Sequence, residues 1–130
     1  MKKILIIDDE PEILEILKFR ISNWGYDPIL AASGEEGIAK ALEHNPDLVL
    51  LDVMMPGMDG FEVLKRLRAT ESTKNVPVIM VTVAAAKTDV EKGMLLGAGF
   101  YLTKPYDAQE LHKRINQMLG AGETEEEGGD

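Results

Sequence analysis

A chain of 130 residues without cysteine is long enough for one domain with its own core, and it excludes a disulfide scaffold or a thiolate metal centre. The net charge of −9, with no basic stripe, argues against direct binding to nucleic acid. No stretch approaches the roughly 18 apolar residues of a membrane span, and the apolar run after Lys2 and Lys3 is too short for a signal peptide. We therefore expect a cytoplasmic protein that does not bind a membrane.

The acidic residues are concentrated at the C-terminal end. Residues 120–130 contain five acidic residues and no basic residue, so residues 1–119 carry a net charge of −4. This segment has almost no apolar side chains to pack, which is typical of disorder. We expect a disordered tail or the start of a linker there, and we favour a solubilising role over an acidic docking role. The folded domain is expected to span residues 1–119.

Apolar runs recur along the chain and predict strands, in order, over residues 4–7, 27–32, 48–51, 78–81 and 99–102. The first, third and fourth runs are continuous rather than alternating. Continuous runs are typical of strands in a parallel sheet that is covered on both faces.

Helical patterns fill the intervals between these strands. The first is expected over residues 11–24, and the fourth over about residues 87–97. Ser33, Asp59 and Asp107 each precede a glutamate by three residues, which is the pattern of a capping box at the start of a helix. The alternation of strand and helix five times over predicts an α/β fold, a doubly wound parallel sheet with helices on both faces.

Polar residues follow four of the five expected strands. Asp8 and Asp9 follow the first strand, Asp52 the third, Thr82 the fourth, and Lys104 comes shortly after the fifth. Taken singly, each has an ordinary structural role, such as capping of the first helix by an aspartate. However, ligands of open α/β sheets bind outside the carboxyl ends of the strands, and adjacent strands lie about 4.8 Å apart. We therefore expect these side chains to converge.

The converging side chains suit a phosphoryl group held with a metal ion. Carboxylates at this spacing repel one another unless a cation is present, and Mg²⁺ binds one or two carboxylates together with waters and a phosphate. Lys104 and the Thr82 hydroxyl add a positive charge and a hydrogen-bond donor. Asp52 ends the central apolar strand and is the best placed nucleophile for an aspartyl phosphate. Gly57 and Gly60, which follow it, are expected to permit sharp turns.

These residues lie in four motifs, "IIDDE" (6–10), "LLDVMMPGMDGFEVLKRLR" (50–68), "VPVIMVTV" (76–83) and "GAGFYLTKPY" (97–106). On these motifs, over residues 3 to about 119, the sequence resembles a response-regulator receiver domain of the chemotaxis-regulator type. The spacing of 30 residues from Asp52 to Thr82, and of 22 from Thr82 to Lys104, matches this family. The resemblance implies a flavodoxin-like fold and a part in two-component signalling.

The resemblance implies that Asp52 is the phosphoacceptor. Its phosphoryl group would come from the phosphohistidine of a histidine kinase or of a histidine phosphotransfer protein. Asp9, Asp52 and the backbone carbonyl of Met54 would bind Mg²⁺ directly, and Asp8 would act through water.

The resemblance also implies a switch that reaches the surface. Lys104 would pair with the phosphoryl oxygens, Thr82 would move toward them, and Tyr101 would turn inward as Thr82 moves. The surface over about residues 84–112, from the fourth helix to the fifth, would then contact a downstream protein or form a dimer promoted by phosphorylation. Val83 replaces the small residue common in the family, and we expect it beside the path of Thr82.

Two other functions fit parts of the pattern. A Mg²⁺-dependent phosphohydrolase of the haloacid-dehalogenase type would need a second acid two residues after Asp52, where this chain has Met54. A receiver-like module that acts without phosphorylation typically lacks part of the acid cluster or the lysine, and this chain retains both. We therefore expect a switch that catalyses only its own phosphotransfer and autodephosphorylation.

Overall fold

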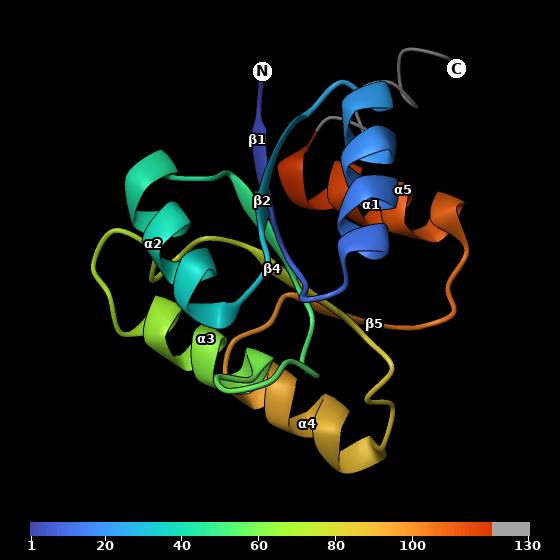
Figure 1. Cartoon of the computed structure of the whole chain (residues 1–130). Helices are drawn as coiled ribbons and strands as arrows, with labels where there is room; N and C mark the ends of the chain where they lie inside the picture. The colour runs from blue at the N-terminus through green and yellow to red at the C-terminus, as the bar shows by residue number, and fades with distance from the viewer. Residues whose placement is uncertain (121–130) are drawn as a thin grey trace.

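The computed structural model describes residues 1–120, in which five parallel strands form one sheet (Figure 1). Their order across the sheet is β2-β1-β3-β4-β5, which confirms the predicted doubly wound α/β fold. Each predicted strand agrees with the observed one to within one residue at either end. The strands are β1 (Lys3–Ile7), β2 (Asp27–Ala31), β3 (Leu48–Leu51), β4 (Val78–Thr82) and β5 (Phe100–Thr103).

Within residues 1–120, five helices cover the two faces of the sheet, with α1 and α5 on one face and α2, α3 and α4 on the other (Figure 1). Alternate residues of each central strand therefore enter different hydrophobic layers. In β1, Ile4 and Ile6 pack toward α1 and α5, whereas Leu5 and Ile7 pack toward α2 and α3. Burial on both faces explains why the apolar runs are continuous. The helices are α1 (Pro11–Asn23), α2 (Gly34–His44), α3 (Gly60–Arg68), α4 (Lys87–Leu95) and α5 (Ala108–Leu119).

Polar caps begin three of these helices. Ser33 and Asp59 each accept a hydrogen bond from the backbone N–H three residues later, as the sequence predicts for α2 and α3. The expectation for α5 is wrong in detail, because Asp107 accepts from the N–H of Gln109. In both α3 and α5 the glutamate of the pattern, Glu62 or Glu110, pairs with an arginine one turn further along its helix.

The strand register brings the polar strand ends to one edge of the sheet. Ile7 of β1 lies opposite Leu51 of β3, so Asp8 and Asp52 follow neighbouring strands at the same level. Beyond the fifth strand, the N–H of Lys104 donates to the carbonyl of Thr82 at 2.8 Å. The edge that carries the carboxyl ends of the strands therefore holds all of the predicted polar positions.

The end of the described chain bears on two of the expectations. The α5 helix is closed by Gly120, whose φ of 79° is left-handed. Residues 121–130, on which the expectation of a disordered tail depends, lie outside the described residues. Within residues 1–120, no helix has the length and apolar character needed to cross a bilayer.

Candidate functional site

Three aspartates meet at the carboxyl edge of the sheet. Asp8, Asp9 and Asp52 each place a carboxylate oxygen within 4.8 Å of the other two. Asp8 and Asp52 are only 3% and 4% exposed, whereas Asp9 is half-buried. The backbone fixes the two buried groups, because Asp8 accepts from the N–H of Glu10 at 2.9 Å and Asp52 from that of Met54 at 3.2 Å.

Lys104 supplies the positive charge at this cluster. Its ammonium nitrogen lies 3.0 Å from one oxygen of Asp8 and 3.6 Å from one of Asp52. The lysine thus joins the ends of β1 and β3 from a position just after β5. Because three carboxylates face one ammonium group, the cluster keeps two formal negative charges.

Burial and charge shift the pKa values of this site. Burial raises the pKa of Asp8, and the nearby charge of Asp52 adds to this effect, although the N–H of Glu10 and the ammonium of Lys104 oppose it. For Lys104, burial alone lowers the pKa. The hydrogen bond to Asp8 and the surrounding carboxylates outweigh burial, so the pKa of Lys104 is raised and the ammonium group stays protonated.

A chain of hydrogen bonds leads from the site to the surface of β5. Thr82 is fully buried, and its hydroxyl oxygen accepts from the N–H of Ala84 at 3.1 Å. The carbonyl of Ala84 in turn accepts from the hydroxyl of Tyr101 at 2.6 Å. The Tyr101 ring lies against Gly93 of α4, where an added Cβ would come within 3.0 Å of it. Burial, followed by the charges of two aspartates, raises the pKa of the Tyr101 hydroxyl to about 12.

Val83 is the first residue after β4. Its side chain is 59% exposed, next to the fully buried Thr82. All residues of β4 are buried and the strand ends at Thr82, so Val83 is exposed because the chain leaves the covered part of the sheet there. The expectation that Val83 lies beside the path of Thr82 stays a prediction.

The two glycines after Asp52 serve different purposes. Gly57 has a left-handed φ of 76°, which agrees with the predicted sharp turn. Gly60, the first residue of α3, has no such φ, and its requirement is steric. A Cβ on Gly60 would lie 2.2 Å from the carbonyl oxygen of Asp52, so only glycine lets α3 approach that peptide. Sequence reasoning missed this contact, although the pairing of Asp59 with Gly60 at a helix start gives a hint of it.

Comparison with known proteins places the chain in a family. The response regulator receiver domain family matches residues 4–116, and the chain belongs to it. A Vibrio cholerae chemotaxis protein, CheY4, has the same fold, with a TM-score of 0.86 and 32% identity over 91% of this chain and 98% of that one. The receiver domain of sensor histidine kinase PA1611 from Pseudomonas aeruginosa gives a TM-score of 0.84 and 28% identity over 92% of this chain and 98% of its own. That structure has a magnesium ion coordinated in the active site cleft.

Curated relatives include longer regulators. The chain is 41% identical over 122 residues to the alkaline phosphatase synthesis transcriptional regulatory protein PhoP of Bacillus subtilis, covering 94% of this chain and 50% of PhoP. It is 42% identical over 119 residues to the DNA-binding dual master transcriptional regulator RpaA of Synechocystis, covering 92% of this chain and 49% of RpaA. The chain therefore spans about half the length of these relatives. The names of these relatives describe regulators and not enzymes. RpaA is named as DNA-binding, so these relatives do not support our expectation that this protein does not bind nucleic acid.

Proposed function

We propose that this receiver domain, spanning residues 1–119, accepts a phosphoryl group on Asp52 from a histidine kinase or a histidine phosphotransfer protein, with Mg²⁺ bound at the acid cluster. One observation carries the proposal. The buried carboxylate of Asp52 shares Lys104 with Asp8 inside a cluster of three aspartates. Burying charged carboxylates costs free energy, so this cluster of aspartates favours a functional site over a purely structural role.

The donor set fits a hard divalent cation. Carboxylate oxygens of Asp8, Asp9 and Asp52 lie within reach of one ion, and the two formal negative charges left by Lys104 match its charge. Among the described residues, no hydrogen bond uses the carbonyl of Met54, which leaves that oxygen available as a further ligand. Bound Mg²⁺ would neutralise negative charge on the phosphoryl oxygens during transfer.

Asp52, Met54 and Lys104 would have different roles in the phosphoryl transfer. A carboxylate oxygen of Asp52 attacks phosphorus, and the bond from phosphorus to the donor histidine nitrogen breaks, with its electron pair returning to the imidazole. The N–H of Met54 keeps the carboxylate oriented, since it already donates to one Asp52 oxygen. Lys104 is close enough to exchange its carboxylate contacts for a phosphoryl oxygen, where its charge stabilises the transferred group.

The hydrogen-bonded chain from Thr82 to Tyr101 supports the proposed switch. If the Thr82 hydroxyl turns toward a phosphoryl oxygen, it stops accepting from the N–H of Ala84. Ala84 still accepts from Tyr101 through its carbonyl, so a shift of Ala84 would move Tyr101 with it. The affected surface is that of α4, β5 and α5, where Met94 and Leu95 are exposed. A downstream protein, or a second copy of the domain after phosphorylation, would bind there.

Intact-mass spectrometry tests the proposal. The protein is incubated with Mg²⁺ and acetyl phosphate, and we expect a gain of one phosphoryl group. Asp52→Asn and chelation of Mg²⁺ with EDTA should each abolish it. Labelling that persists in both controls would rule out the proposed site, and steady release of phosphate from unrelated phosphoesters would indicate a hydrolase instead.

A further inference from the structure

Helix α4 is attached to the domain by few buried side chains. In α4, which lies wholly within the described residues 1–120, Gly93 is the only buried residue, whereas α3 of the same length buries five. Met94 and Leu95 are exposed, and the helix begins after Ala86, which provides no side-chain cap. The position of α4 therefore depends on a small number of contacts around Gly93.

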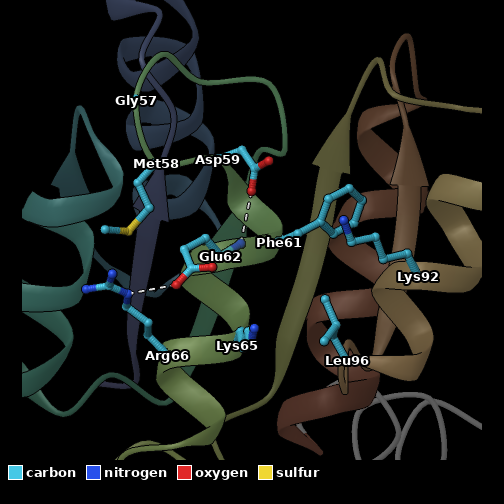
Figure 2. Close-up of a pocket in the computed structure, with 9 residues that line it drawn as sticks. All are labelled: Gly57, Met58, Asp59, Phe61, Glu62, Lys65, Arg66, Lys92 and Leu96. Carbon is cyan, nitrogen blue, oxygen red and sulfur yellow. Dashed lines mark hydrogen bonds and ion pairs between the residues drawn. The ribbon is translucent and has the colours of Figure 1, made fainter.

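Two aromatic rings face Gly93. A Cβ added to this glycine would lie 3.0 Å from the ring carbons Cδ2 and Cε2 of Tyr101, and 3.7 Å from Cε1 of Phe61. The second distance is an ordinary contact, but the first is shorter than carbon atoms normally approach. Figure 2 shows Phe61 pointing from α3 toward Lys92 on α4, whose ammonium nitrogen lies 4.7 Å from the centroid of the ring. The middle of α4 thus rests on the rings of Phe61 and Tyr101.

The C-terminal end of α4 is held by a separate contact. The guanidinium group of Arg68, on α3, donates to the carbonyl of Gly97 at 2.8 Å. The same group donates to the carbonyls of Thr73 and Lys74 at 3.3 Å and 3.2 Å, which fixes its own position. A displacement at Gly93 would therefore tilt α4 about this anchored end.

The ring that lies against Gly93 is itself held within the proposed switch. The hydroxyl of Tyr101 donates to the carbonyl of Ala84 at 2.6 Å, so the ring cannot yield to a larger side chain at position 93 without straining this bond. Glycine is unfavourable inside a helix, and the close ring gives a packing reason for its presence here.

We propose that Gly93 is a positioning residue of the switch, because its missing side chain lets the ring of Tyr101 lie against α4 and transmit its movement to that helix. The transmission rests on the proposed function, since Tyr101 would move when Thr82 and Ala84 respond to the phosphoryl group. The packing of Tyr101 on Gly93 does not rest on it. Each part therefore has its own experiment.

A double-mutant cycle in urea tests the packing. Gly93→Ala is introduced into the wild type, into Tyr101→Phe and into Tyr101→Ala. In Tyr101→Ala only the gain in helix propensity remains, so the urea midpoint should rise. In the wild type the change in midpoint should be less favourable by about 0.5 M, and Tyr101→Phe should fall between the two because no hydroxyl bond holds its ring.

Thr88→Ala is the matched control, because it raises helix propensity at an exposed position of α4. It should change the midpoint equally in all three backgrounds. If Gly93→Ala alone does not fold, the double variant with Tyr101→Ala should restore folding. Equal effects of Gly93→Ala in all three backgrounds, or a double variant that stays unfolded, would overturn the packing.

NMR with ¹³C-labelled tyrosine and ¹⁵N-labelled amides tests the transmission. On addition of Mg²⁺ and acetyl phosphate, the Tyr101 ring signal, identified by its loss in Tyr101→Phe, should shift together with the amides of α4 in the wild type and in Thr88→Ala. In Gly93→Ala the ring signal should differ before phosphorylation, and the α4 amides should shift only about half as far.

Intact mass of the same samples gives the fraction that carries a phosphoryl group. Equal shifts of the α4 amides in Gly93→Ala and the wild type, at equal phosphorylated fractions, would refute the transmission. If no sample gains a phosphoryl group, the proposed function fails and the transmission fails with it. The urea series would still decide whether Tyr101 rests on Gly93.

Discussion

Gly60→Ala tests how the backbone positions the phosphoacceptor. The new Cβ would lie 2.2 Å from the carbonyl oxygen of Asp52 and 2.8 Å from both the carbonyl carbon of Asp52 and the Cα of Val53. All three atoms belong to the backbone, so no side-chain rotation relieves the contact. Either α3 or the peptide after Asp52 must move, by about 1 Å for normal contact distances.

The magnitude follows from opposing effects. Overpacking of this kind lowers the free energy of unfolding by about 1–3 kcal/mol, and the better helix propensity of alanine returns at most ~1 kcal/mol. We expect a net loss of about 2 kcal/mol. A displacement of ~1 Å at a reacting group can lower a rate by about 100-fold, so phosphorylation by acetyl phosphate should slow far more than the loss of stability explains.

Gly57→Ala is the matched control for this experiment. Gly57 has no atom within 4 Å of an added Cβ, and its φ of 76° imposes only backbone strain of about 1 kcal/mol. Urea denaturation gives the stability of both variants, and a time course of intact mass gives their labelling rates. The reasoning fails if Gly60→Ala labels at the rate of the wild type, or if Gly57→Ala slows labelling to the same extent.

Three further predictions concern the acid cluster. Lys104→Met leaves two buried carboxylates without their cation. In metal-free protein at pH 7, urea denaturation should therefore show a free energy of unfolding that is lower by ~2 kcal/mol. An unchanged value would show that the ion pairs contribute nothing to stability. Mg²⁺ at ten times its Kd should raise the free energy of unfolding by about 1.4 kcal/mol, and a similar gain in Asp52→Asn would argue against the proposed ligands. Since burial raises the folded-state pKa of Asp8, its ionised form opposes folding, and this penalty disappears as the pH falls toward the ordinary value of 3.8. Asp8→Asn should therefore stabilise metal-free protein at pH 7 with a gain that vanishes near pH 4 in a urea series, and a gain that grows at low pH would contradict the sign.

The sequence predicted the fold because its local signals agree with one another. The continuous run at residues 48–51 and the caps at Ser33 and Asp59 appear in the structure where they were expected. The cap at Asp107 shows the limit of such patterns. Spacing identifies possible hydrogen-bond partners, but competition decides between them, and both Glu62 and Glu110 contact an arginine one turn away.

The meeting of the site residues could be predicted from topology, but their contacts could not. Asp8 and Asp52 follow adjacent strands, and this alone places them together. Lys104 lies closer to Asp8 than to Asp52, and this difference depends on side-chain rotamers. The hydrogen bonds from Thr82 through Ala84 to Tyr101 depend on rotamers and also on backbone groups. Sequence patterns do not report these features.

The central claim is that Asp52 carries the phosphoryl group, and chemical trapping tests it most directly. An acyl phosphate is reduced by borohydride, which converts the phosphorylated aspartate to homoserine. After incubation with acetyl phosphate and Mg²⁺, reduction and peptide mass spectrometry, we predict homoserine at position 52 and aspartate at positions 8 and 9. Homoserine at position 8 or 9, or unmodified aspartate at position 52 in protein that has gained a phosphoryl group, would contradict the account.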